Sequence, residues 1–161
     1  MSGPSYLNSV NLKQDSDFPY LVLEVINDES YPRNPGFQVM HWHEDLQFIY
    51  VLEGEIVVVT LSVRVRLRRG DGIFLNRNVV HLVRKVTACH YKSFLFPERF
   101  LKFYPGSPAE RMVERIVGRP ELPIRAIREE EGAVTRLLQK LCRMEEGKSA
   151  WYPYEVLTTL C

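Results

Sequence analysis

Eight short apolar segments between residues 20 and 96 constrain the fold of this chain more than any other feature. Each is rich in β-branched and aromatic residues and is bounded by turn residues, a pattern typical of β-strands. The predicted strands cover residues 20–26, 36–43, 47–54, 55–61, 63–70, 72–76, 81–86 and 89–96. No gap between them is long enough for a helical crossover, so we expect an antiparallel sheet that closes as a sandwich, barrel or jelly roll.

After Phe103 the apolar residues follow a helical period instead. Ser107 followed by Pro108 favours a helix start, and Gly118 is a fitting helix end. A second helix is predicted over residues 129–147, after an irregular stretch that begins at residue 119. A third helix starts near the end of the sequence without a residue to cap its end, so we expect it to continue in a longer protein.

Composition and charge narrow the class of protein. The 161 residues suit one domain, with 45% apolar and 25% charged side chains. A net charge of +1 gives no general reason to expect nucleic-acid binding. Neither a signal peptide nor a membrane span is apparent. Because the three cysteines Cys89, Cys142 and Cys161 are widely separated and odd in number, we expect reduced thiols in a cytoplasmic protein.

An arginine stripe, Arg64, Arg66 and Arg68, alternates with apolar residues along one predicted strand. Such a stripe could suggest a DNA contact. The solvated outer face of a half-buried strand explains the alternation better.

The stretch "HWHEDLQFIYVLEG" at residues 41–54 carries the candidate site. Alternate strand residues share a face, so His41, His43 and Gln47 can point into one cavity, with Ile49 and Val51 lining its floor. Two imidazoles and an amide oxygen could hold a metal ion, could bind a small molecule directly, or could simply fill the cavity by bonding to one another or to water.

Two spaced motifs resemble those of the cupin superfamily, whose fold is a double-stranded β-helix of the jelly-roll type. Their residues are Gly36, His41, His43, Gln47 and Gly54, then Gly70, Asn76, Asn78 and His81. The resemblance implies a mainly β fold and a metal ligand set of His41, His43, Gln47 and His81, for Zn, Ni, Fe or Mn. Gln47 stands where the family has Glu, and this loss of a negative charge weakens cation binding.

The order of these motifs, followed by "FPERFLKFYPGS" and helices, resembles the N-terminal sensor domain of AraC-type transcription regulators. That resemblance implies an arm over residues 1–17, a cupin barrel over 18–104, and a helical dimerisation segment over 105–161 that is cut before a DNA-binding domain. It also implies a small-molecule effector, for which a sugar is one candidate, no enzymatic activity, and DNA contact only through the missing domain. The expected homodimer contact is the stripe Val134, Leu137, Leu138 and Leu141.

Two other functions remain open on the residues alone. One is a free-standing metal-dependent cupin enzyme, such as a dioxygenase or a sugar isomerase, and the other is a storage or carbohydrate-binding cupin. Fold does not decide among them, because function depends on the site. The missing Glu ligand and the unfinished C-terminal helix favour the regulator.

Overall fold

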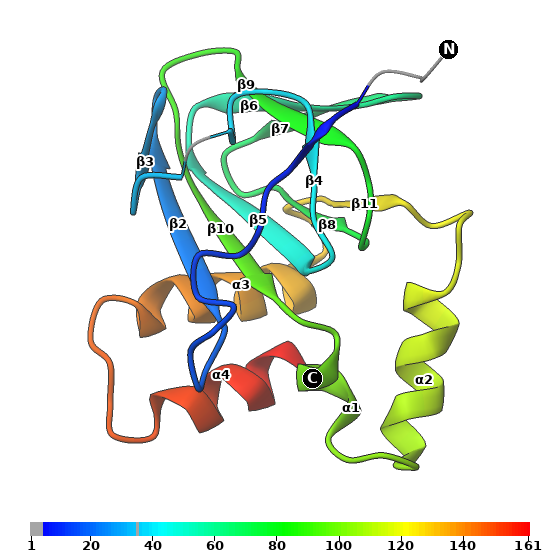
Figure 1. Cartoon of the computed structure of the whole chain (residues 1–161). Helices are drawn as coiled ribbons and strands as arrows, with labels where there is room; N and C mark the ends of the chain where they lie inside the picture. Colours follow the sequence, from blue (N-terminus) through cyan, green and yellow to red (C-terminus); the bar gives the residue numbers. More distant parts are fainter. Residues whose placement is uncertain (1–4, 35) are drawn as a thin grey trace.

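A computed structural model describes residues 5–34 and 36–161 and places two β-sheets face to face (Figure 1). The five-stranded sheet has the order β1 (Leu7–Asn8), β4 (His41–Trp42), β9 (His81–Lys85), β6 (Glu55–Thr60) and β7 (Arg64–Arg68). The six-stranded sheet has the order β11 (Ile124–Ile127), β8 (Gly72–Leu75), β5 (Leu46–Glu53), β10 (His90–Phe96), β2 (Leu21–Ile26) and β3 (Glu29–Tyr31). All pairings are antiparallel except that of β1 with β4.

Four helices follow or interrupt the last strands: α1 (Arg99–Lys102), α2 (Pro108–Val117), α3 (Gly132–Met144) and α4 (Tyr152–Leu160). In Figure 1, α3 and α4 lie on the side of the six-stranded sheet, away from β6, β7 and β9. The predicted mainly β jelly roll with C-terminal helices is confirmed. In the described part of the chain, no helix combines the length and the apolar character that a bilayer crossing would require.

Strand alternation separates two hydrophobic layers. Ile49 and Val51 of β5 are fully buried between the sheets, whereas Tyr50 between them belongs to the layer under the helices. Phe94 and Phe96 of β10 extend that outer layer. The site therefore opens into the space between the sheets, and the helices pack on the opposite side of the six-stranded sheet.

Apart from the short strands β1 and β3, which were not predicted, two stretches differ from the prediction. Of residues 36–43, only His41–Trp42 form a strand, because Gly36 adopts a φ of 93° and the chain turns before it reaches β4. The stretch from residue 119, predicted to be irregular, contains β11, which pairs with β8 at the sheet edge. A four-residue strand has too few residues for its period to be recognised, and a partner from elsewhere in the chain stabilises it.

Helix α2 begins and ends as predicted. The hydroxyl of Ser107 accepts a hydrogen bond from the backbone N–H of Glu110 at 3.2 Å, and Pro108 is the first helical residue. At the other end, the N–H of Gly118 donates to the carbonyl of Glu114 at 2.9 Å.

The α3 stripe divides between the core and the surface. Leu138 and Leu141 are each 2% exposed and pack in the layer between α3 and the sheet, so their assignment to a dimer contact is corrected. Val134 is half-buried against the same layer, and Leu137 is 46% exposed. The jelly roll leaves one outer sheet face to be covered, and α3 uses most of its apolar stripe to cover it.

Candidate functional site

Three histidines from two strands and a loop meet between the sheets. His41 and His81 are direct partners across β4 and β9, with ring centroids 4.4 Å apart, and the ring centroid of His43 lies 5.2 Å from that of His81. One ring nitrogen of each lies within 4.8 Å of the other two. All three residues are buried. The fourth histidine, His90, lies elsewhere and pairs with Glu24.

Backbone carbonyls fix the tautomer of each ring. The Nδ1 atoms of His41, His43 and His81 lie 2.7, 2.9 and 2.8 Å from the carbonyl oxygens of Val39, Asp45 and Val79, respectively. A carbonyl can only accept, so each Nδ1 carries the ring proton and donates it. Each Nε2 is left with a free lone pair. Metal-binding histidines are usually oriented in this way by a carbonyl or carboxylate at the other nitrogen.

Burial keeps the rings neutral. Desolvation lowers the pKa of His41 and that of His43, although hydrogen bonds oppose the effect in both. For His81, burial and the two neighbouring imidazoles lower the pKa to about 3. Neutral imidazoles are the form that coordinates metal ions.

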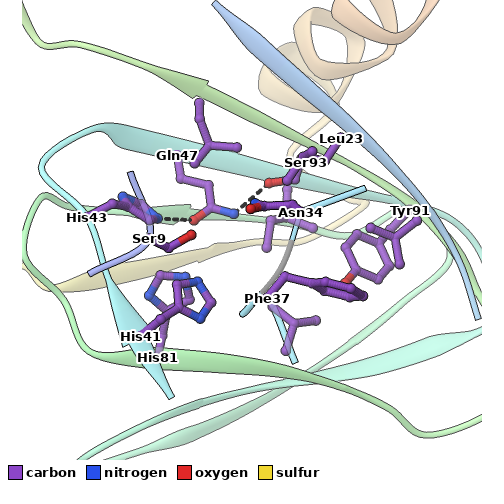
Figure 2. A pocket seen from close by; sticks show the side chains of 14 residues that line it. Ser9, Leu23, Asn34, Phe37, His41, His43, Gln47, His81, Tyr91 and Ser93 are labelled. Atoms are coloured by element: carbon purple, nitrogen blue, oxygen red, sulfur yellow. Dashed lines mark hydrogen bonds between the residues drawn. The ribbon is translucent and has the colours of Figure 1, made fainter. Parts of the chain in front are cut away.

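Gln47 completes the group from β5. Its amide nitrogen donates to the hydroxyl of Ser93 at 2.5 Å, and its Oε1 lies 2.9 Å from Nε2 of His43. Figure 2 shows both contacts as dashed lines. With the ring proton on Nδ1, Nε2 of His43 is an acceptor, as is the Oε1 that faces it. Two arrangements satisfy this contact: a cation bound by both atoms, or the amide rotated by 180°, so that its N–H donates to Nε2 of His43 and its oxygen accepts from the Ser93 hydroxyl.

The donor set therefore fits a metal ion. Nε2 of His81 is buried without a hydrogen-bond partner among the described residues, as is expected of an atom reserved for a ligand. Zinc bonds to imidazole nitrogen at about 2.0–2.1 Å in a tetrahedral arrangement, which places two such nitrogens about 3.4 Å apart. Nitrogens up to 4.8 Å apart would therefore have to approach one another by as much as about 1.4 Å to share one ion. His41, His43, His81 and Gln47 would hold it, and the ion would supply a Lewis-acidic centre.

The cavity that the rings enclose is small, about 30 Å³. Such a volume holds an ion with one water, whereas bound small molecules fill about 300–1,000 Å³. Ile49 lines it as expected, but Val51 does not, because it lies two residues further along β5, beside Tyr91. The lining is Ser9, Leu23, Val25, Asn34, Phe37, His41, His43, Gln47, Ile49, His81, Val83, Tyr91, Ser93 and Leu95.

The segment before Phe18 closes one side of this cavity. Its strand β1 pairs with β4, the N–H of Ser9 donates to the carbonyl of Trp42 at 2.8 Å, and Ser9 itself lines the cavity. Further along, the Asn11 amide donates to Asp45 at 2.5 Å. The predicted arm of residues 1–17 thus includes described residues that lie against the barrel, while residues 1–4 lie outside the described residues.

Sequence reasoning missed several residues of the lining. Ser93 holds the amide of Gln47, and its parity with Tyr91 and Leu95 on one predicted strand was the signal that could have found it. Ser9, Asn34 and Phe37 come from irregular or very short elements, where no period indicates which way a side chain points.

Comparisons with known proteins indicate the same fold. Residues 29–91 match the family model described as "Cupin domain". A 50-residue segment of this chain is 28% identical to part of YdeC, a Bacillus subtilis (strain 168) protein described as an uncharacterized HTH-type transcriptional regulator. The match covers 31% of this chain and 17% of that protein.

Two solved structures of ToxT from Vibrio cholerae strain SCE256 share the fold over 87% of this chain. The apo K231A form has a TM-score of 0.53 at 8% identity, and the wild-type form with a bound unsaturated fatty acid has a TM-score of 0.53 at 10% identity. The chain spans about half the length of ToxT, 53% and 52% in the two structures. Residues 29–91 of this chain thus match a cupin domain, and they lie within a jelly roll that continues into C-terminal helices.

Proposed function

We propose that this chain is the effector-binding domain of an AraC-type transcription regulator, and that its histidine centre holds a divalent metal ion. The observation that carries the proposal is the convergence of three unprotonated imidazole nitrogens and one side-chain amide on a small buried cavity. Such a set can bind a cation, or a ligand that donates hydrogen bonds. A sensor can use either one, because ligand binding shifts an equilibrium only through different affinities for its two states.

The relatives support a regulator over other cupins. The likeness to ToxT extends beyond the barrel into the helices, since it covers 87% of the chain. ToxT with a bound unsaturated fatty acid also offers a precedent for a small ligand on this fold. The sequence match to an HTH-type regulator points to the same class. On this proposal a DNA-binding domain belongs to the complete protein, and two chains form a dimer.

A metal-dependent enzyme is the second candidate, because a three-histidine centre with open coordination positions is typical of catalytic metal sites. The cavity favours the sensor, since among the described residues of its lining the only acid–base side chain beside the three histidines proposed as metal ligands is Tyr91, whose pKa is raised by burial. We therefore propose that the chain is not an enzyme. Oxygen consumption by the iron-loaded protein with catechol or cysteine, above that of a His81→Ala variant, would favour the enzyme instead.

A reporter fusion tests the sensor proposal. Residues 1–161 are joined to a DNA-binding domain that represses its operator only as a dimer. The expected result is repression that changes at least several-fold when cells are supplied with, or deprived of, zinc, nickel, iron or manganese, and that no longer responds in a His43→Ala variant. Arg143→Ala, an exposed change on α3, is the matched control. Repression with the same response in the His43→Ala fusion would contradict the proposal.

A further inference from the structure

The cavity beside the histidines is about ten times smaller than an ordinary small-molecule effector requires. About 30 Å³ holds the ion and a water, and a sugar or an acid of ordinary size needs several hundred. If the proposed function holds, some part of the wall must move before such a molecule can reach the histidines. The thinnest part of the wall is the place where that movement costs least.

Phe37 forms that part of the wall. Two surface hollows, of about 510 and 520 Å³, lie outside the cavity, and Phe37 lines both of them as well as the cavity itself. Asn34 also lines the cavity and the first hollow, while Val83 and Tyr91 line the cavity and the second. In Figure 2 the Phe37 ring lies beside Tyr91, on the opposite side of the cavity from His43.

The ring of Phe37 is held by apolar contact alone. It is half-buried against the inner core, and its backbone lies in a turn outside the strands. Its backbone N–H donates to the carbonyl of Asn34 at 3.5 Å, and the side-chain amide of the neighbouring Gln38 donates to the carbonyl of Asp28 at 2.6 Å, but neither bond involves the ring. A rotation of the Phe37 side chain therefore breaks no hydrogen bond and gives up only part of one ring's burial.

The N-terminal segment, by contrast, is fastened by several hydrogen bonds. β1 pairs with β4, Ser9 donates to Trp42, and the Asn11 amide donates to Asp45 and to the carbonyl of Pro19. Each such bond stabilises the docked segment, and more so where an ionised group takes part. Opening the cavity on that side requires all of these hydrogen bonds to break together, so rotation of Phe37 is the easier route.

We propose that Phe37 is the gate of the cavity and selects the ligands that reach it. With its ring rotated outward, the cavity and both hollows become one space of ligand size. The inner end offers the histidine centre and Gln47, and the nearby walls are apolar, from Leu23, Val25 and Leu95. The fitting ligand is a compact molecule with an oxygen-bearing head for the centre and an apolar body for these walls.

A thiol placed behind the gate measures access without any knowledge of the effector. Ser93→Cys puts the thiol in the buried lining, in a Cys161→Ser background that removes the exposed native cysteine. The rate of modification by methyl methanethiosulfonate is followed by mass spectrometry. Adding Phe37→Ala is expected to raise this rate at least tenfold, and adding Phe37→Trp to lower it. Phe103→Ala, at a ring 64% exposed elsewhere on the surface, should leave it unchanged.

The native Cys142 serves as an internal monitor, because it is buried on the helix side of the sheet. Its modification reports general unfolding and should not accelerate with Phe37→Ala. If Phe37→Ala unfolds the protein, Phe37→Leu gives the same comparison with a milder change. An unchanged modification rate at the introduced thiol, or acceleration by Asn11→Ala in place of the Phe37 variants, overturns the proposal. Since no effector or DNA is involved, this result is independent of the reporter test of function.

Discussion

The Nε2 atom of His81 is energetically the least favourable atom of the metal-free site, because it is buried and has no hydrogen-bond partner among the described residues. An unsatisfied buried polar atom costs about 1–3 kcal/mol. A chain selected only for stability would replace His81 with an apolar residue of similar size. Its presence fits the metal-binding role proposed for this centre.

The low histidine pKa values predict how stability of the metal-free protein depends on pH. His81 has a pKa of about 3 in the folded chain and an ordinary value of 6.5 when unfolded. The unfolded state thus binds more protons between these values, so stability is complete above about pH 6.5 and falls below it, by up to about 1.4 kcal/mol per pH unit for this group. Urea unfolding in EDTA at pH 7.5 and pH 5 measures the loss. It should be clearly smaller in His81→Asn, and an equal loss would contradict the account.

Gln47→Glu is predicted to tighten metal binding. The carboxylate supplies the negative charge that partly neutralises a divalent ion in a buried site, so the dissociation constant for zinc should fall at least tenfold, about 1.4 kcal/mol. Isothermal titration of the two proteins gives both constants. Gln47→Leu, which keeps neither the oxygen nor the charge, should bind more weakly than the native protein. Unchanged affinity in Gln47→Glu would place Gln47 outside the centre.

At the site, the sequence could predict which side chains converge, but not which tautomer each histidine adopts. Strand parity predicted that His41, His43 and Gln47 converge, and the second motif added His81. The four do converge, but His41 and Gln47 lie on strands of different sheets and His43 lies in the loop between them. The carbonyls that fix the tautomers belong to Val39, Asp45 and Val79, and no side-chain pattern reveals where a backbone oxygen points. Phe37 was missed because it lies in a turn, where no strand or helix period indicates the direction of a side chain.

At the scale of elements, helix α3 separates core from surface within one stripe. Leu138→Ala is predicted to lower the free energy of unfolding by about 2–5 kcal/mol, because the side chain is buried against the sheet. Leu137→Ala, one residue away and 46% exposed, should change it by no more than about 0.5 kcal/mol. Urea titration of both variants measures the two changes in the free energy of unfolding. Equal losses would mean that α3 does not pack as described.

The elements themselves were predictable where the period was long enough. Strands of five or more residues and the capped helix α2 follow directly from alternation, from Ser107 and from Gly118. The misses are β1, β3 and β11, each of four residues or fewer, and the turn that replaces most of the strand expected over residues 36–43. Short strands depend on partners distant in sequence, and local propensity does not carry that information.

At the scale of the whole molecule, the predicted homodimer depends on surface that the chain leaves exposed. With Leu138 and Leu141 in the core, Leu137 is the member of the stripe most available to a partner. We expect a dimer at tens of micromolar, roughly where a modest two-fold interface holds, and weaker association after Leu137→Asp. Sedimentation velocity measures both. A native monomer at that concentration would contradict the prediction.

We predict that this chain does not bind DNA sequence-specifically, despite the arginine stripe on β7. Arg64, Arg66 and Arg68 are exposed on β7, with Arg66 paired to Glu55, which fits a solvated outer face. Any binding to duplex DNA should therefore be weak and should fall steeply with salt. Fluorescence anisotropy between roughly 50 and 200 mM salt tests this. Sequence-dependent binding by this chain at the higher salt would contradict it.

One measurement tests the central claim most directly, namely that His41, His43, His81 and Gln47 form a single ion-binding centre. The protein is stripped with chelator, dialysed against zinc, and assayed for metal content per chain. The account predicts one bound ion per chain in the native protein and almost none in His81→Ala, while His90→Ala, outside the centre, retains its ion. A native protein that binds no zinc, nickel, iron or manganese, or a His81→Ala variant that binds as well as the native protein, would contradict it.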